Sequence, residues 1–204
     1  MDGKRMRFYD EAAKSTAANY EAVDAQPIVT PVLDFLPEGG RLLDLGCGSG
    51  RDAAFFLKQG YDVTGLDGSE AMLREASSYH PELLGRLVHH ELPWPLPFDA
   101  GNFDIVLSFA VIMHLEEAHL SRLFSEIARV LRPGGVAAYS VNTARPGLDE
   151  HGDDSNGRHF TCLDAERWER YHLSAGLETV AVWDNEDITG RPGIRWVTFV
   201  CRRP

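Results

Sequence analysis

Short apolar runs alternate with stretches of helical periodicity along most of the chain. Five β-rich runs are predicted to form strands: 41–45, 61–67, 86–92, 103–109 and 136–141. The clearest helix is predicted over 116–132, where apolar residues recur every three or four positions and mark one face. Such alternation of strand and helix predicts a parallel sheet with right-handed crossovers and helices on both faces.

The two ends of the chain depart from this alternation. Residues 8–36 are predicted to be helical, with Pro27 favourably placed at a helix start. After the fifth strand, residues 161–164 resemble a capping box that opens a helix. Two more runs, 177–183 and 195–201, are joined too closely for a crossover helix and should pair antiparallel. We therefore predict an α/β, Rossmann-like fold whose seven-stranded sheet has five parallel strands plus a C-terminal antiparallel hairpin.

The length of 204 residues suits one α/β domain. Within 1–204 we expect an N-terminal helical cap (1–40), the alternating core (41–141), a lid-like loop (142–160), and a C-terminal helix with the β-hairpin (161–204). The loop has few apolar residues. A loop this long in a compact domain is either functional or mobile, so a lid and a plain solvated insertion both stay open.

The net charge and the cysteine content limit the kinds of partner and metal site that the protein is expected to have. Twenty Lys and Arg against 31 Asp and Glu give a net charge of −11, which disfavours a nucleic-acid partner. No stretch reaches the ~20 apolar residues of a membrane span, and no signal peptide is visible. Cys47, Cys162 and Cys201 are odd in number and widely spaced, which suggests neither disulfides nor a zinc site. We expect a cytoplasmic protein without membrane partners; the sequence does not indicate its oligomeric state.

The strongest chemical signal is the run from Leu42 to Arg51, where a buried strand enters a glycine-rich turn and then a helix. Gly46 and Gly48 allow a sharp turn and close approach of a ligand, and the helix N-terminus offers free N–H groups. The spacing is G-x-G-x-G, so Arg51 stands where a dinucleotide fingerprint needs its third glycine. Asp44, two residues before the first glycine, would repel a pyrophosphate and attract a cation.

This run resembles motif I of the class I S-adenosylmethionine-dependent methyltransferases. The resemblance implies that Asp44, Gly46 and Gly48 hold the methionine part of S-adenosyl-L-methionine, which carries an α-ammonium and a sulfonium. Cys47 is expected to be a small loop residue of the same site. Arg51 is expected to bind the cofactor's carboxylate, with an ordinary surface arginine as the alternative.

Two further motifs follow in order. Asp67, at the end of the second strand, can accept both ribose hydroxyls, and Gly68 follows it. Met72 would pack on the adenine or simply belong to the core. Glu91 and Leu92 stand where the family usually has Asp and an apolar residue beside the adenine amino group.

The fourth motif is the run 103–115, which resembles the family's fourth strand and the bend after it. The resemblance places Phe109 and Ala110 beside the cofactor and points His114 toward the transferred methyl. His114 is therefore a candidate catalytic residue, as a general base or a shape element, with a structural histidine as the alternative. Together these motifs identify 41–141 as the cofactor-binding core.

Five residues outside this core are weaker candidates. In relatives, an N-terminal helix covers the cofactor, so Tyr9 and Tyr20 would contact its methionine end or merely pack the cap. Within the loop, His151, Arg158 and His159 are candidate substrate contacts.

The reaction implied by the resemblance is in-line transfer of the sulfonium methyl to a small-molecule nucleophile, leaving S-adenosyl-L-homocysteine. Ser108 occupies the place of the carboxylate in metal-dependent catechol-type enzymes, so no metal is expected. The glycine run also looks like that of bacterial tellurite-resistance-type enzymes. A cofactor-binding protein of this fold without catalysis and an NAD-type oxidoreductase are the alternatives.

Overall fold

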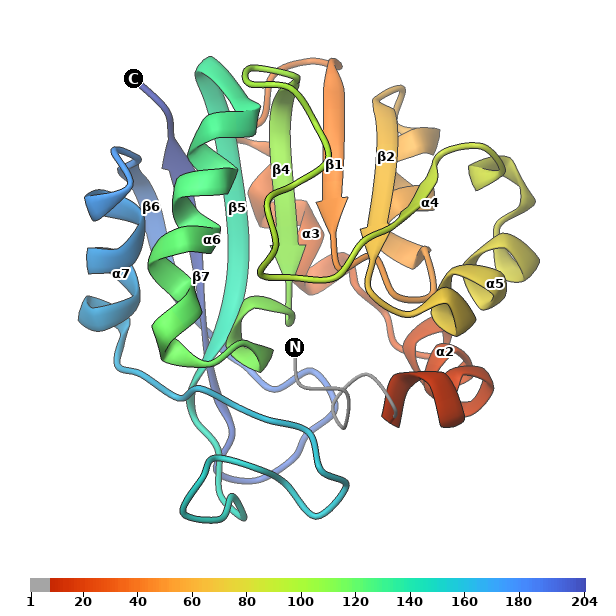
Figure 1. The fold of residues 1–204 in the computed structure, drawn as a ribbon, viewed down its shortest axis with the longest axis vertical. Coiled ribbons are helices and arrows are strands. Elements are labelled where there is room, and N and C mark those ends of the chain that lie inside the picture. Colours follow the sequence, from red (N-terminus) through yellow and green to blue (C-terminus); the bar gives the residue numbers. More distant parts are fainter. Residues whose placement is uncertain (1–7) are drawn as a thin grey trace.

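The computed structural model describes residues 8–204, which form one seven-stranded sheet of order β3-β2-β1-β4-β5-β7-β6 (Figure 1). The first five strands pair in parallel, and β7 pairs antiparallel with both β5 and β6. The predicted fold class is thereby confirmed. The strands are β1 (Arg41–Leu45), β2 (Asp62–Asp67), β3 (Leu87–His89), β4 (Phe103–Phe109), β5 (Leu131–Ala144), β6 (Glu178–Glu186) and β7 (Arg195–Arg202).

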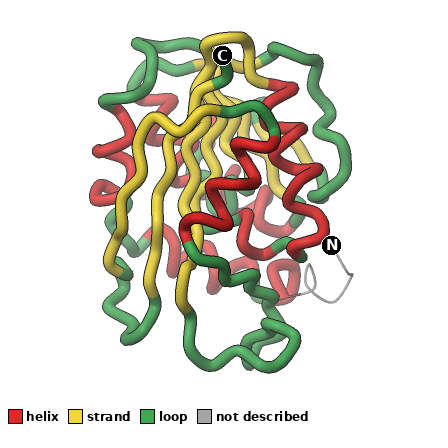
Figure 2. Tube along the Cα trace, turned by 90° about the vertical axis from the view of Figure 1, so that its left-hand side faces the viewer, coloured by secondary structure: helices red, strands yellow, loops and turns green. Residues whose placement is uncertain are grey.

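Helices cover both faces of the sheet, as the view along its edge shows (Figure 2). Helices α6 and α7 pack on one face with β4, β5 and β7, and α3 and α4 pack on the other. Helix α5 lies against β2 and β3 and also contacts α2. The helices are α2 (Ala13–Glu21), α3 (Gln26–Leu33), α4 (Arg51–Lys58), α5 (Glu70–Tyr79), α6 (Glu117–Val130) and α7 (Ala165–Ser174).

Helix α6 shows why its sequence folds this way. Its buried residues are Leu120, Leu123, Phe124, Ile127 and Val130, which form the apolar stripe that the spacing predicts. Full burial of each such side chain contributes about 1.5–3 kcal/mol before the entropy cost of ordering it. This burial, rather than helix propensity alone, fixes α6 against the sheet.

Several element boundaries differ from the sequence prediction, and three of the differences have a clear structural description. Strand β3 ends at His89 instead of residue 92, because it is an edge strand and Pro93 soon follows, without an N–H to donate. Strand β5 begins already at Leu131, and its register with β4 shifts before Val136. Helix α7 is capped by Asp164, whose Oδ1 accepts from the amide of Arg167 at 2.8 Å, and not by the predicted box at Thr161.

The loop after β5 lies beyond the carboxyl ends of the parallel strands, on the same side as the N-terminal helices (Figure 1). It is fixed to the core where the amide of Thr161 donates to the carbonyl of Met113 at 2.7 Å. A lid function of residues 142–160 stays a prediction. Within residues 8–204, no helix is both long and apolar enough to cross a membrane.

Candidate active site

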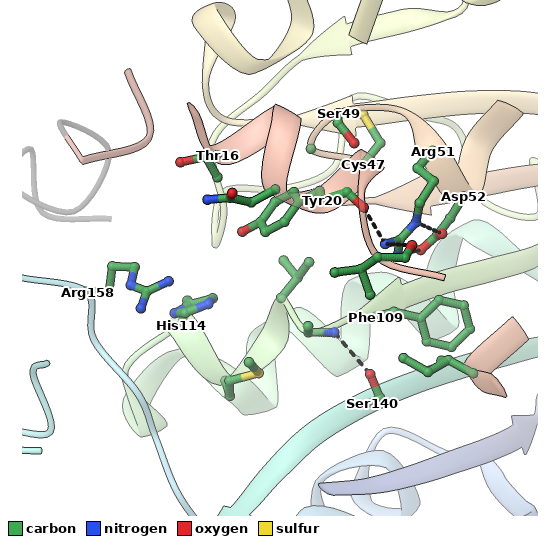
Figure 3. A pocket seen from close by; sticks show the side chains of 18 of the residues that line it. Thr16, Tyr20, Cys47, Ser49, Arg51, Asp52, Phe109, His114, Ser140 and Arg158 are labelled. Atoms are coloured by element: carbon green, nitrogen blue, oxygen red, sulfur yellow. Dashed lines mark hydrogen bonds and ion pairs between the residues drawn. The ribbon is translucent and has the colours of Figure 1, made fainter. Parts of the chain in front are cut away.

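A cavity of about 510 Å³ opens at the carboxyl ends of β1, β2 and β4 (Figure 3). This volume falls within the ~300–1,000 Å³ typical of small-molecule sites, and its position is the usual one for open α/β sheets. Most of the residues predicted from sequence line it together: Tyr9, Tyr20, Gly46, Cys47, Gly48, Arg51, Asp67, Gly68, Met72, Leu92, Phe109, Ala110, His114 and Arg158.

The glycine turn forms a cradle that side chains would fill. Gly46 has φ +81°, and a Cβ built on it would lie 2.5 Å from both γ-carbons of Val111. Gly48 also has a left-handed backbone, with φ +54°. The amides of Gly46 and Cys47 both donate to the carbonyl of Leu66, at 2.7 and 3.0 Å. The turn is therefore held against the end of β2, where glycine is required.

Asp67 stands at the opposite wall of this cradle. Its Oδ2 accepts from the amide of Gly48 and its Oδ1 from the amide of Ser69, both at 2.9 Å. Burial raises the pKa of Asp67, and these amide donors oppose the shift. Each carboxylate oxygen has a second lone pair, so the pair of oxygens can still accept two hydroxyls. This geometry suits a vicinal diol such as a ribose.

Asp44 lies beneath the turn and is 4% exposed, outside the cavity lining. Its Oδ2 has no hydrogen-bond partner among residues 8–204. Burial raises the pKa of this carboxyl, and the negative charges of Asp52 and Asp67 add to the effect. A buried polar group left unsatisfied costs about 1–3 kcal/mol, so the site favours a cationic group or a water as neighbour. The buried negative charge favours a cationic group on the cavity side of the turn, such as the α-ammonium of S-adenosyl-L-methionine.

Arg51 joins the cavity to the N-terminal helices. Its guanidinium donates to both carboxylate oxygens of Asp52, at 2.8 and 3.2 Å. It also donates to the carbonyls of Tyr20 and Val23, at 2.9 and 3.3 Å (Figure 3). Arg51 therefore holds the helical cap in place. Its predicted contact with the cofactor's carboxylate stays a prediction.

His114 and Tyr9 form a pair at the other end of the cavity. The Nδ1 of His114 lies 2.7 Å from the carbonyl oxygen of His159, which can only accept, so Nδ1 carries the proton. Nε2 then accepts from the hydroxyl of Tyr9 at 3.3 Å. Burial lowers the pKa of His114 to about 4, so the ring is neutral at pH 7. Its free lone pair sits on Nε2, in the direction of Tyr9.

Besides Asp44, three of the predicted residues are not brought to the cavity wall. Glu91 is half-buried next to Leu92 but is not part of the lining. The His151 side chain is 77% exposed. The His159 ring bonds Asp153 at 3.0 Å and Thr161 at 3.1 Å, so only its backbone reaches His114.

The structure adds lining residues that sequence reasoning missed. Arg145 directly follows β5, and Ser140 lies within it; the Oγ and the carbonyl of Ser140 both accept from the amide of Ala110 at 3.1 Å. Arg191 comes from the loop between β6 and β7, and Trp196 lies near the start of β7. The signal for Arg145 was available, because ligand-binding residues gather at the carboxyl ends of parallel strands.

Residues 42–135 match a family model described as a methyltransferase domain. Strands β2, β3 and β4, the glycine turn and the acid at the end of β2 lie within this match. Residues 42–135 are therefore similar to methyltransferase domains.

The curated sequence relatives of this chain are longer proteins. The biotin biosynthesis bifunctional protein BioHC of Cellvibrio japonicus is 36% identical over 148 residues, which is 71% of this chain and 26% of the relative. The chain spans at most about half the length of the first curated relatives that it matches.

Solved structures share the fold at lower identity. The 1,6-didemethyltoxoflavin-N1-methyltransferase of Burkholderia thailandensis, solved with 1,6-didemethyltoxoflavin and S-adenosylhomocysteine, has a TM-score of 0.78 at 20% identity, covering 97% of this chain and 86% of its own. A TehB-like methyltransferase of Corynebacterium glutamicum has a TM-score of 0.70 at 22% identity, covering 97% and 98%. These likenesses show the fold alone, so the resemblance of this chain to tellurite-resistance-type enzymes stays a prediction.

Proposed function

We propose that this protein is an enzyme that transfers the methyl group of S-adenosyl-L-methionine to a small-molecule nucleophile. The observation that carries the proposal is the joint geometry of Asp44, the glycine turn and Asp67. The turn lies between the buried, unpaired carboxylate oxygen of Asp44 and the diol acceptor Asp67, and its glycines let a ligand approach the backbone closely. A diphosphate would meet two carboxylates there, which disfavours an NAD-type oxidoreductase.

S-adenosyl-L-methionine, when bound, supplies an activated methyl group, so the residues of this chain mainly position and desolvate the reactants. Asp44 would face the ammonium, Asp67 the ribose hydroxyls, and Met72 and Leu92 the adenine. Tyr20, from the cap, and Phe109, from β4, would exclude water from the two sides of the cavity.

His114 limits the choice of acceptor. Its Nε2 can take a proton only weakly, because burial lowers the pKa of the ring to about 4. A nucleophile that is already ionised or soft needs no base, whereas an alcohol would. We therefore assign His114 to orienting Tyr9 and the acceptor, and to accepting a proton only from a group acidified by the site.

Several features support a small molecule as acceptor and the cytoplasm as location. The cavity has the size of a small-molecule site. One structural neighbour was solved with the small molecule 1,6-didemethyltoxoflavin bound. None of the three cysteines is in a disulfide, which agrees with a reducing compartment.

Calorimetry tests the cofactor assignment. S-adenosylhomocysteine should bind and NAD should not. Asp67→Ala should weaken S-adenosylhomocysteine binding by about 1.5–3 kcal/mol, or roughly 10- to 150-fold, because charged hydrogen bonds are lost. Asp62→Asn is the matched control, because Asp62 starts the same strand at the far end and is 65% exposed. Micromolar NAD binding without S-adenosylhomocysteine binding would refute the proposal.

Labelled cofactor tests catalysis. Methyl transfer should occur to at least one member of a panel of thiols, phenols, amines and carboxylates. Cofactor binding without transfer to any of them would support the non-catalytic alternative.

A further inference from the structure

Three arginines line the end of the cavity that lies toward the loop and the C-terminal hairpin: Arg145, Arg158 and Arg191. Two of them form ion pairs with a neighbouring aspartate. Arg158 donates to Asp154 Oδ2 from Nε at 2.9 Å and from Nη2 at 2.6 Å. Arg191 donates to both carboxylate oxygens of Asp187, from Nε to Oδ2 at 3.1 Å and from Nη2 to Oδ1 at 2.6 Å.

Arg145 has no comparable partner. Its side chain is 10% exposed, and its guanidinium carbon lies 3.8 Å from the centroid of the Phe160 ring. Among residues 8–204 no hydrogen bond satisfies its N–H groups, and its ion-pair contact there is Asp154 Oδ2 at 3.8 Å. Burial lowers the pKa of Arg145, and the charges of Arg158 and Arg191 act in the same direction.

Asp154 is already occupied. Its Oδ1 accepts from the amides of Asn156 and Arg158, at 2.9 and 3.0 Å, and its Oδ2 takes both guanidinium bonds of Arg158. Two arginines thus share one carboxylate, and the sum of their charges leaves one positive charge at this end of the cavity. A buried charge without a partner is strongly unfavourable, so its presence on a cavity wall indicates a ligand of opposite charge.

We propose that the methyl acceptor carries a carboxylate and that Arg145 binds it. That the ligand is the methyl acceptor rests on the proposed function. That an anion binds to Arg145 does not rest on it. A guanidinium offers a planar pair of donors that matches both oxygens of a carboxylate. The neighbouring walls include Phe160, Ile188 and Trp196, which suit an organic body attached to that carboxylate rather than a bare inorganic ion.

The carboxylate of the cofactor is the main competitor for Arg145. The two ends of the cavity argue against it. In Figure 3, His114 and Arg158 lie at one end, Arg51 and Asp52 lie at the other, and Tyr20 stands between them. Arg145 belongs to the first end, because Phe160 contacts both its guanidinium and the His114 ring, whose centroid is 4.5 Å away. The glycine turn leads directly into Arg51, so the methionine part is expected at the second end.

The test uses the full chain and three variants. Arg145→Gln removes the charge, Arg145→Lys keeps the charge without the fork, and Arg170→Gln is the control on α7, where the side chain is 59% exposed. S-adenosylhomocysteine is titrated first. Acetate, benzoate, phenylacetate and 4-hydroxybenzoate are then titrated into the S-adenosylhomocysteine complex and, separately, into the free protein, alongside the corresponding neutral amides. Thermal unfolding of each variant verifies that it is folded.

The proposal expects at least one carboxylate to bind the wild-type chain more tightly than its amide. Arg145→Gln should weaken that binding about 10- to 100-fold, as for loss of a charged hydrogen-bond pair, while Arg145→Lys loses less. Binding of S-adenosylhomocysteine should stay within twofold in all variants.

Three results would overturn the inference. In the first, no carboxylate binds up to about 10 mM, or amides bind equally well. In the second, carboxylate binding is the same in Arg145→Gln and Arg170→Gln. In the third, Arg145→Gln weakens S-adenosylhomocysteine instead, which would assign Arg145 to the cofactor. Failure of the proposed function gives a different result, because S-adenosylhomocysteine would then not bind the wild-type chain. Titration of carboxylates into the free protein would still test the anion site in that case.

Discussion

Replacing Asp44 with asparagine should stabilise the cofactor-free protein. Asp44 is 4% exposed, and its Oδ2 has no hydrogen-bond partner within residues 8–204. An unsatisfied buried polar group costs about 1–3 kcal/mol, and more when it is charged. Asparagine keeps the shape and removes the charge but leaves a buried amide, so we expect a gain of about 1–2 kcal/mol in the free energy of unfolding at pH 7.

The gain should depend on pH with a definite sign. Burial, with the charges of Asp52 and Asp67, raises the pKa of Asp44 in the folded chain. The unfolded chain releases the proton near pH ~3.9, whereas the folded chain resists release. The wild-type protein therefore loses stability relative to Asp44→Asn as pH rises from about 4 toward the folded pKa. Urea unfolding at several pH values should show the advantage of the variant shrinking toward pH 4.

Cofactor binding should move in the opposite direction. Asp44→Asn removes the carboxylate proposed to face the ammonium, so affinity should fall by about 1–3 kcal/mol, roughly 5- to 150-fold. The loss should be larger for S-adenosylmethionine than for S-adenosylhomocysteine, which lacks the sulfonium charge. Asp62→Asn serves as control. A variant that is less stable at pH 7, or that binds both compounds as the wild type does, would refute this reasoning.

Two further predictions concern stability. Gly46→Ala should cost about 1–3 kcal/mol more than Gly85→Ala in urea unfolding, because both glycines have φ near +80° but only the new Cβ at Gly46 meets Val111, at 2.5 Å; equal costs would contradict the close contact. Burial lowers the pKa values of His114 and His172 to about 4, so stability should fall between pH 6.5 and 4 by about 1.4 kcal/mol per pH unit for each histidine. His172→Gln should reduce that slope, and an unchanged slope would show that His172 is protonated in the folded chain.

Most of the sheet could be predicted from the sequence, for a physical reason. Strands β1 and β4 have the bounds that their apolar runs predict, because both lie in the middle of the sheet and are buried on both faces. Strand β3 lies at an edge, where apolar burial no longer fixes the length and Pro93 decides it. The capping residue of α7 was misplaced because Thr161 and Asp164 both suit an N-cap, and only the tertiary contact of Thr161 with Leu115 decides between them.

The candidate site also has a part that the sequence predicts and a part that it does not. Motif residues such as Gly48 and Asp67 meet because each lies at the end of a neighbouring parallel strand, which the sequence reveals. Charge compensation is not visible in the sequence. Asp154 accepts hydrogen bonds from Arg158 and lies 3.8 Å from Arg145, and this arrangement depends on how the loop folds back on itself. Candidates in that loop could therefore be named as a group but not ranked.

The insertion of β7 between β5 and β6 has an evolutionary consequence. It brings the tip of the C-terminal hairpin, with Arg191 and Trp196, to the same cavity as the glycine turn. The turn lies within the matched region 42–135, whereas Arg145 and the hairpin lie outside it. One half of the cavity can thus stay constant while mutations in the other half change which compounds enter. Replacing residues 145–196 with those of a relative should then change the acceptor specificity and leave the half of the cavity formed by residues 42–135 unchanged.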